Sequence, residues 1–501
     1  MAEWINRISE WNGLLNGIVW GPYTLLLLLG AGLYFSIATG FLQWRKFGLV
    51  MHETLFKFFK PQKDKNAISP VKALSTALAG TMGTGNIAGV ATAIMIGGPG
   101  AIFWMWVSAF LGMMTKYAEV FLAVRFRRKN SQGQWIGGPM YYMEDGLNAP
   151  LLGVIFAVLG LLTSFGIGNV AQVNSISEAM KTSFEIPPVV TGIVVAILAA
   201  AVMIGGAKRI YNVAAWIVPL MSVLYIGGSL YVIWQYADQI PGAFVQMIAY
   251  AFKPAPAAGG FLGASVSNAL RFGVARGVFS NEAGMGSAPI AHAAAETDSP
   301  IRQGLWGIFE VFADTIVACT LTALVILATG VCQSGSSGAT LTIMAFEKGM
   351  GRFGSSFVAI SMLFFAFASI LGWSYYGEKC LEYLSGTKFL HGSLAKKRKR
   401  RGALPKPLRD RNKPKAYEKS ARIYKAIFAA VIVLGSVSRL DLVWNISDTL
   451  NGLMAIPNMA AIILLGRIVI QTTNKDKQIL IKPGKSSLHR SIKKKASMDV
   501  S

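Results

Sequence analysis

Residues 74–99 read LSTALAGTMGTGNIAGVATAIMIGGP, a stretch long and apolar enough to cross a lipid bilayer. Its centre is crowded with glycines and short polar residues: Gly80, Thr81, Gly83, Thr84, Gly85, Asn86 and Gly89. Each glycine weakens a helix by about 1 kcal/mol relative to alanine. Within a bilayer, the backbone groups that a broken helix frees are tolerated only where they line a protein cavity or bind a ligand. The stretch therefore predicts a broken transmembrane helix whose exposed backbone forms a binding site.

Two other interpretations of this stretch stand beside the first. A glycine-rich nucleotide loop would need G-x-G-x-x-G or a P-loop lysine, but the spacing here is G-T-G-N-I-A-G and no such lysine follows. The small residues could instead serve close helix packing alone.

The composition predicts a polytopic membrane protein, because 53% of the 501 residues are hydrophobic and only 14% are charged. The formal net charge is +24, and most of the 48 Lys and Arg residues fall in alternate loops, which the positive-inside rule places in the cytoplasm. The positive charge therefore does not imply nucleic acid as a partner. The three cysteines and four histidines have no paired or metal-ligand spacing, so we expect no cofactor and no metal site other than one for a coupling ion.

Apolar runs separated by charged or Gly/Pro-rich breaks predict an all-α protein with about 11 transmembrane helices. The run near 18–38 is interpreted as a retained first span rather than a signal peptide. The predicted N-terminus lies outside the cell membrane and the C-terminus lies in the cytoplasm. The predicted divisions are a first span with a basic inner loop, 1–72; a first set of five spans, 73–235, with an interfacial helix near 137–147; an outer loop, 236–260; a second set of five spans, 261–470; and a basic cytoplasmic tail, 471–501.

The most basic inner segment is 388–425, which contains KKRKRRGALPKPLRDRNKPK at 396–415. A basic run beside membrane spans is attracted to anionic lipid by about 1 kcal/mol per residue near the surface. We expect an anionic lipid surface to be its partner, and the sequence predicts no particular protein partner.

A second interrupted span reads FLGASVSNALRFGVARGVFSNEAGMGSAPIAHAAAE, 261–296. Each interrupted span is the first of a set of five spans. Because an odd number of spans separates the starts of the two sets, the second set is inserted in the membrane upside down relative to the first. Inverted repeats with broken helices at matching positions indicate the binding site of a secondary transporter. We expect its charged residues to pair near the second break and Lys116 to interact with Glu119; the expected pairing set is Arg276, Glu282, Glu310 and Asp314.

A broken helix supplies binding chemistry of its own. Where the helix restarts, free N–H groups and about half a positive charge favour a carboxylate, here at Thr84, Gly85 and Asn86. The preceding half ends in free carbonyls, from Ala79 to Met82, which suit a small cation. Because nucleotide motifs are absent from the sequence, the coupling is expected to use an ion gradient.

Several motifs in order resemble the alanine or glycine:cation symporter family, also called sodium:alanine symporters. They are GTGNIAGVATAI, GGPGAIFWMW, TKYAE, GGPMYYMEDGL and ARGVFSNEAGMGSAPIAHAAA, with LGWSYYGE at 371–378. The resemblance implies a five-plus-five inverted-repeat fold of the neurotransmitter:sodium symporter type. It also implies sodium-driven uptake of a small neutral amino acid, alanine or glycine. The basic run 396–415 is longer and more charged than the family pattern.

The resemblance also implies roles for single residues. Thr84, Gly85 and Asn86 would meet the substrate carboxylate, and Gln172 would contact the amino or carboxylate group. The second break would contribute Phe279, Ser280 and Asn281, and Trp373 would cap the side-chain pocket. Sodium would take the carbonyls of Ala79 and Met82 with the hydroxyl of Ser369. Without the resemblance, Trp373 and Phe279 fit ordinary core packing, and Gln172 fits an interhelical hydrogen bond.

The sequence leaves alternatives of function open. A proton-coupled transporter of the same fold would use Glu282, Glu310 or Asp314. A channel or membrane receptor is a hypothesis from another class. An enzyme is not expected, because no pairing of a nucleophile with a base and no metal cluster is evident.

Overall fold

The computed structural model describes residues 2–58, 68–130, 132–254, 265–336, 338–386, 413–438 and 440–475. The described chain is helical, apart from a short antiparallel ribbon of β1, Arg128–Lys129, and β2, Trp135–Ile136. Its first half contains α1 Ala2–Val19, α2 Pro22–Ala38, α3 Leu42–Arg45, α4 Phe47–Phe58, α5 Pro70–Thr81, η1 Thr84–Asn86, α6 Ala88–Gly97, α7 Gly100–Arg125, α8 Pro139–Gly146, α9 Pro150–Phe165, η2 Gly166–Val170, α10 Ala171–Phe184, α11 Pro188–Ile204, α12 Gly206–Gln235, η3 Ala237–Gln239 and α13 Ile240–Ala249.

The second half has the same helical character. It contains α14 Val266–Asn281, α15 Ala288–His292, α16 Pro300–Val311, η5 Phe312–Cys319, α17 Thr320–Thr329, η6 Val331–Ser334, α18 Gly338–Met350, α19 Arg352–Gly386, α20 Lys413–Ser436, α21 Leu440–Leu464 and α22 Gly466–Lys475. Three of these helices have a serine as N-cap. Ser69, Ser265 and Ser299 accept hydrogen bonds from backbone N–H groups in the first turns of α5, α14 and α16.

Within the described residues, six helical stretches are long and apolar enough to cross a membrane. They are Glu10–Ala38, Gly100–Arg125, Pro150–Phe184, Gly206–Gln235, Pro300–Thr329 and Arg352–Gly386. A seventh span results if Asn445–Leu464 and Gly466–Lys475, which meet at a bend of 50°, count as one. Two shorter apolar helices are α6 and α11. The eleven-span arrangement with its inverted repeat stays a prediction.

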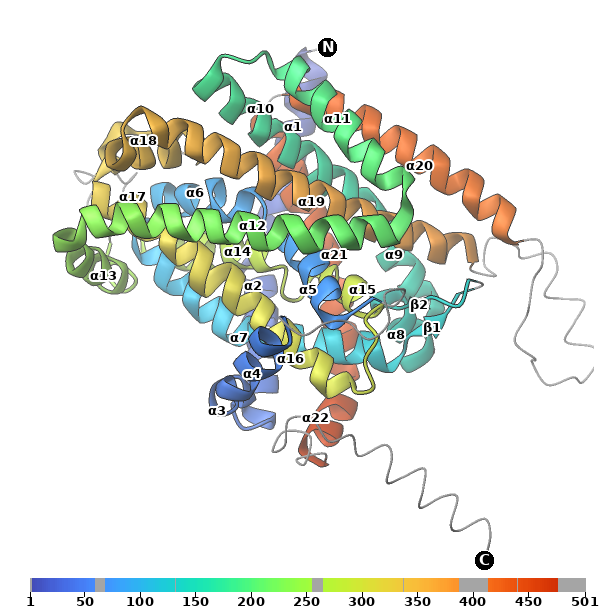
Figure 1. Ribbon diagram of the computed structural model, residues 1–501. Coiled ribbons are helices and arrows are strands. Elements are labelled where there is room, and N and C mark those ends of the chain that lie inside the picture. The colour runs from blue at the N-terminus through green and yellow to red at the C-terminus, as the bar shows by residue number, and fades with distance from the viewer. Residues whose placement is uncertain are drawn as a thin grey trace, which may run out of the picture.

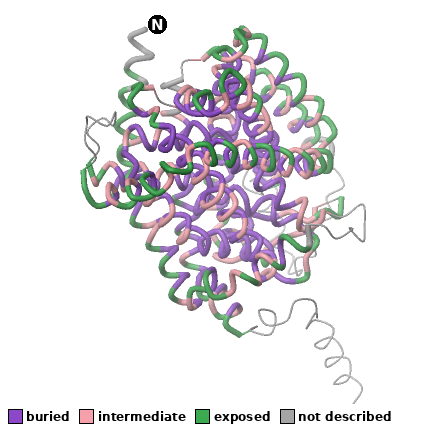
Figure 2. Tube along the Cα trace, turned by 60° about the vertical axis from the view of Figure 1, so that its left-hand side comes forward, coloured by how far each residue is buried: buried purple, intermediate pink, exposed green. Residues whose placement is uncertain are grey.

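The peripheral helices expose large apolar side chains, as expected of surfaces that face lipid. Exposed examples on α11, α12 and α20 are Ile197, Ile204, Trp216, Val223 and Leu434. Buried residues concentrate in the middle of the molecule, with exposed ones along its periphery (Figure 2). The molecule therefore has a protein-lined centre that both interrupted spans can reach.

The segments that the sequence predicts on one side of the membrane lie on one side of the molecule. In Figure 1, α4, α8 and the β1–β2 ribbon, which belong to predicted inner segments, lie toward the bottom and right. Helix α22, which runs from the last predicted span into the predicted inner tail, lies at the bottom. Helices α6, α13 and α18 end or lie toward the left, where the predicted outer segments gather. The side of the membrane on which each of these segments lies stays a prediction.

Some predicted loops contain helices. The expected basic loop after the first span includes α3 and α4, and the expected outer loop 236–260 includes α13. The Gly- and Ser-rich connection after α17 leads into α18. The predicted interfacial helix is present as α8. Most of the basic segment 388–425 and of the tail 471–501 lies outside the described residues.

Candidate functional site

The first break lies in the glycine-rich stretch where the sequence places it. Helix α5 ends at Thr81, a single turn follows at η1, and α6 begins at Ala88. Within the break, the Gly83 N–H donates to the side-chain oxygen of Asn86 at 3.1 Å. The hydroxyl of Thr322 donates to the Asn86 carbonyl at 2.7 Å, and that of Thr342 donates to the Ile87 carbonyl at 3.1 Å. Side chains thus take over the hydrogen bonds that the helix loses at the break.

The second break lies between α14 and α15. Glu282 ends α14 in the left-handed region at φ 54°, and Gly284 and Gly286 follow at φ 94° and φ 80°. Because Gly284 and Gly286 have no Cβ, they adopt this backbone conformation without strain, and the chain can turn sharply here. Asn281 caps the turn, because its side-chain oxygen accepts from the Ala283 N–H at 2.9 Å and its amide donates to Thr315 at 3.0 Å.

Asp314 joins the two breaks. Its fully buried side chain accepts from the Asn86 amide at 2.8 Å and from the Ser280 hydroxyl at 2.8 Å. The Asn86 amide also lies 3.1 Å from the Asp314 carbonyl, and Thr315 donates to the carboxylate at 2.8 Å. Asp314 lies in η5, a π-helical segment, and such segments are frequent at functional sites. Each of its side-chain donors is neutral.

Gln172, on α10, joins the fourth predicted span to the first break. The Thr84 N–H donates to the Gln172 side-chain oxygen at 3.1 Å, and the Gln172 amide donates to the Ile167 carbonyl at 2.9 Å. Ile167 belongs to η2, the π-helical segment of the fourth predicted span. The Thr84 hydroxyl is buried and has no hydrogen-bond partner within the described part of the chain. An unsatisfied donor at this depth is costly unless a ligand engages it.

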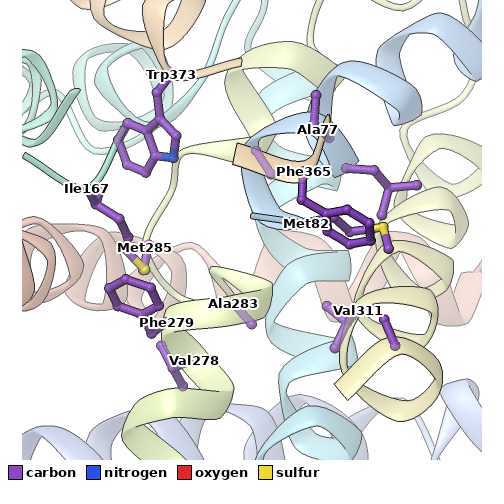
Figure 3. Close-up of a cluster of buried hydrophobic side chains, with 14 of the residues drawn as sticks. Ala77, Met82, Ile167, Val278, Phe279, Ala283, Met285, Val311, Phe365 and Trp373 are labelled. Carbon is purple, nitrogen blue, oxygen red and sulfur yellow. The ribbon is translucent and has the colours of Figure 1, made fainter. Parts of the chain in front are cut away.

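Trp373 covers the side of the second break. Its indole N–H donates to the Glu282 carboxylate at 2.9 Å, and the Ser287 hydroxyl donates to the other oxygen of that carboxylate. Figure 3 shows Trp373, Ile167, Met285 and Phe279 in one buried cluster beside the loop of the break. Glycine is required at position 168, because a Cβ there would lie 2.2 Å from the Trp373 Cβ.

The predicted substrate residues are thus brought together at the two breaks. A Cβ on Gly85 would lie 3.3 Å from the Phe279 ring and from the Ser280 Cα, so the breaks touch at this glycine. The predicted set Thr84, Gly85, Asn86, Gln172, Phe279, Ser280, Asn281 and Trp373 is buried throughout. Their contacts with a substrate stay a prediction.

The three residues predicted for sodium lie at the end of α5 and on α19. The Ser369 hydroxyl donates to the Gly80 carbonyl at 3.0 Å. Gly80 lies between Ala79 and Met82 in the sequence. A Cβ on Gly83 would lie 3.1 Å from the same hydroxyl. Ser369 is therefore next to the helix end that the sequence assigns to a cation, and the sodium ligand set stays a prediction.

The predicted pairing of charges is wrong in its partners. Arg276 pairs with Asp448 on α21 at 2.7 Å rather than with a carboxylate of the second break. Glu310 pairs with Lys116 at 3.5 Å and with His292 at 2.9 Å, because α16 packs directly against α7 and the break.

The predicted interaction between Lys116 and Glu119 is electrostatic, and each side chain also has a hydrogen-bond partner at the second break. The Lys116 ammonium donates to the Glu282 carbonyl at 3.1 Å. Glu119 accepts from the Gly286 N–H at 3.0 Å and from the Asn458 amide, which also donates to the Gly284 carbonyl at 2.8 Å. Two neighbouring turns of α7 therefore support the backbone of the second break.

The Arg276–Asp448 pair lies beside a small surface cavity of about 40 Å³, which Asn16, Trp20, Arg271, Phe272 and Ala275 also line. The Arg276 guanidinium lies over the Phe279 ring, 5.3 Å from its centroid. Phe279 therefore stands between this cavity and the first break.

On the opposite side of the break, Arg127 donates to the carbonyls of Ala295 at 2.6 Å and Thr297 at 2.7 Å. Arg127 thereby holds the chain just after α15.

The predicted site set omits Asp314 and Asn458, which the structure places at the breaks. A polar residue within an otherwise apolar span was the available signal for each, and Asn458 also follows Pro457. The partners of these residues come from distant parts of the chain, so spacing along the sequence cannot supply them.

Comparison with known proteins gives concordant findings. A model of the sodium:alanine symporter family matches residues 5–396 and 414–487. The sodium/alanine symporter AgcS of Methanococcus maripaludis is 44% identical over 467 residues, covering 92% of this chain and 95% of that protein. A Bacillus subtilis protein named "Probable sodium/glutamine symporter GlnT" is 38% identical, covering 94% of this chain and 91% of that protein.

The fold also resembles a solved structure. The crystal structure of MhsT in complex with L-phenylalanine aligns with a TM-score of 0.53 at 14% identity, covering 80% of this chain and 90% of that one. At this identity, the likeness concerns the fold alone.

Proposed function

We propose, because this chain belongs to the sodium:alanine symporter family, that it imports a small neutral amino acid, alanine or glycine, together with sodium by alternating access. One observation carries the proposal. Two broken helices meet at the buried centre, and the side chains of Asn86, Asp314 and Ser280 bridge them. A ligand bound there touches both halves and can change how they fit together.

The substrate carboxylate would bind at the restart of the first broken helix. The N–H groups of Thr84, Gly85 and Asn86 lie at the end with positive partial charge, next to the unpartnered Thr84 hydroxyl. The Thr84 N–H is now bonded to Gln172, so the substrate would take over that donor and free the Gln172 oxygen for its ammonium group. Ser280 and Asn281 would bound the site from the second break.

The substrate side chain would lie against Trp373, Phe279 and the neighbouring apolar side chains. These bulky groups are close-packed, which favours alanine or glycine over a large residue. The relative named for glutamine indicates that this family scaffold admits more than one amino acid.

Sodium would bind at the end of α5, with the carbonyls of Ala79 and Met82 and the hydroxyl of Ser369 as its ligands. Oxygen ligands of this kind suit a hard monovalent cation, and a half-helix C-terminus adds negative partial charge. The ion and the substrate carboxylate would then lie on opposite sides of one break, where each stabilises the other.

For alternating access, the Arg276–Asp448 pair with Phe279 would close the outer side, and the Arg127 contacts would close the inner side. The N-terminus would face outside and the C-terminus the cytoplasm, in agreement with the basic inner segments. The membrane would be the cell membrane, with anionic lipid at the basic inner loops.

A second candidate function is proton coupling on the same fold. It is favoured by the Asp314 carboxylate, which lies between the two breaks among neutral donors. A proton there would take the place of sodium in linking the two halves.

Uptake into proteoliposomes tests the function. We expect labelled alanine to accumulate above its external concentration when sodium is imposed outside, and not when potassium replaces it. A competition panel of glycine, serine, glutamine and phenylalanine should show glycine competing best and phenylalanine least. Accumulation driven by a pH gradient without sodium would favour the proton-coupled candidate, and facilitated equilibration alone would contradict coupling.

A further inference from the structure

A positively charged side chain lies at the end of the second broken helix. Lys116 of α7 is fully buried, and its ammonium donates to the Glu282 carbonyl at 3.1 Å. Glu282 is the residue at which α14 ends, and its own N–H already bonds back to the Val278 carbonyl at 2.8 Å. The ammonium therefore lies at the carbonyl end of the first half of this span.

A carbonyl end of this kind is where broken-helix transporters coordinate a coupling cation. The end of a helix carries about half a negative charge, so a cation near it is favoured. At the first break, the Gly80 carbonyl near the end of α5 accepts from a neutral group, the Ser369 hydroxyl, at 3.0 Å. At the second break, the chain supplies the cation itself.

The position of Lys116 is fixed by its surroundings. A Cβ on Gly307 would lie 3.1 Å from the Lys116 Cγ and 3.2 Å from its carbonyl oxygen, so glycine at this position lets α16 pack closely against α7 beside Lys116. The Glu310 carboxylate of α16 lies 3.5 Å from the ammonium and is itself held by His292 at 2.9 Å. The Gln303 amide lies 2.9 Å from the other ring nitrogen of His292. This chain of contacts leaves the ammonium little freedom to leave the break.

We propose that Lys116 is a tethered cation that takes the place of a second coupling ion at the second break, so that one sodium ion accompanies each substrate. The inference rests on the proposed function. A bound sodium ion leaves with its substrate, whereas a covalently tethered ammonium stays through the whole cycle. Lys116 is thus a positioning residue, which acts on the substrate through the Glu282 backbone and the Trp373–Glu282 contact.

The test measures coupling in proteoliposomes of the full chain. Initial alanine uptake is recorded against sodium concentration, and the charge moved per alanine is obtained from the membrane voltage at which net flux stops. The wild type should show a Hill coefficient for sodium of about one and about one charge per alanine. Lys116→Arg should keep both values. Lys116→Ser removes the tethered charge and leaves space and a hydroxyl, so its sodium dependence should steepen toward a Hill coefficient of about two.

Lys116→Met keeps the length of the side chain without charge or donor, and its maximal rate should fall at least about tenfold without recovery at high sodium. Lys379→Met is the matched control, because Lys379 is also buried and pairs with Glu382 at 2.6 Å, away from the breaks. Its Hill coefficient should equal that of the wild type. Thermal melting in detergent separates loss of folding from loss of coupling.

Wild-type uptake that moves two sodium ions per alanine would overturn the proposal while leaving sodium symport intact. Unchanged kinetics in Lys116→Met would overturn it as well. Wild-type uptake that ignores sodium would instead refute the proposed function. If Lys116→Ser does not fold, the wild-type stoichiometry and the Lys116→Met rate still decide.

Discussion

Replacing Asn86 by alanine is expected to lower alanine transport by about 100-fold or more, with the protein still present in the membrane. The change removes the donor to the Asp314 carboxylate at 2.8 Å and the acceptor for the Gly83 N–H at 3.1 Å. A lost hydrogen bond to a buried charged group costs about 1.5–3 kcal/mol, and here the two helix breaks also lose the link through Asp314. Initial uptake rates and the KM for alanine, normalised to membrane abundance, measure the effect.

Asn174→Ala is the control for this change. Asn174 is also buried, but it donates to the carbonyls of Gly435, near the end of α20, and of Ser438, just after that helix. Its replacement should lower abundance or melting temperature while leaving the KM near the wild-type value. Equal KM values for Asn86→Ala and the wild type would exclude Asn86 from the site.

Gly83→Ala is expected to reduce uptake by about 10- to 100-fold, whereas Gly89→Ala in the same stretch is expected to be tolerated. A Cβ on Gly83 would lie 2.9 Å from the Gln172 side-chain oxygen and 3.1 Å from the Ser369 hydroxyl. Overpacking of this kind costs about 1–3 kcal/mol and here displaces the acceptor of the Thr84 N–H. A Cβ on Gly89 meets nothing within 4 Å, and alanine there can stabilise α6 by up to about 1 kcal/mol.

Uptake rates and melting temperatures of the two variants separate their effects. The site interpretation requires loss of uptake in Gly83→Ala and retained uptake in Gly89→Ala. Similar losses in both would mean that the glycines serve close helix packing alone, as one of the other interpretations of this stretch holds.

The sequence was most informative where one residue type decides the backbone. Clustered glycines with Asn86 located the first break, because a helix in lipid cannot propagate through them without a partner for its backbone. For the second break, the sequence indicated an interrupted span over 261–296, and the structure places the break after Asn281. The family resemblance then supplied Gln172 and Trp373, which without it fitted an interhelical hydrogen bond and core packing, respectively. Both lie beside the breaks through contacts with Thr84 and Glu282.

What the sequence left unresolved depends on contacts between distant spans. Arg276 was expected to find a carboxylate near the second break, but its partner Asp448 is 172 residues further along the chain. Lys116 has a carboxylate three residues away, yet it reaches Glu282 and Glu310 because α14 and α16 both pack on α7. Helix spacing describes neighbours on one helix, and a buried charge selects its partner from every helix around it.

Equilibrium binding of alanine to the purified protein, with and without sodium, tests most directly the claim that ion and substrate share the first break. The Kd for alanine should fall at least about tenfold when sodium replaces potassium at constant ionic strength, and alanine should tighten sodium binding by the same factor, since linkage is reciprocal. In Asn86→Ala this factor should approach one. An alanine Kd that is the same in sodium and in potassium would contradict the account.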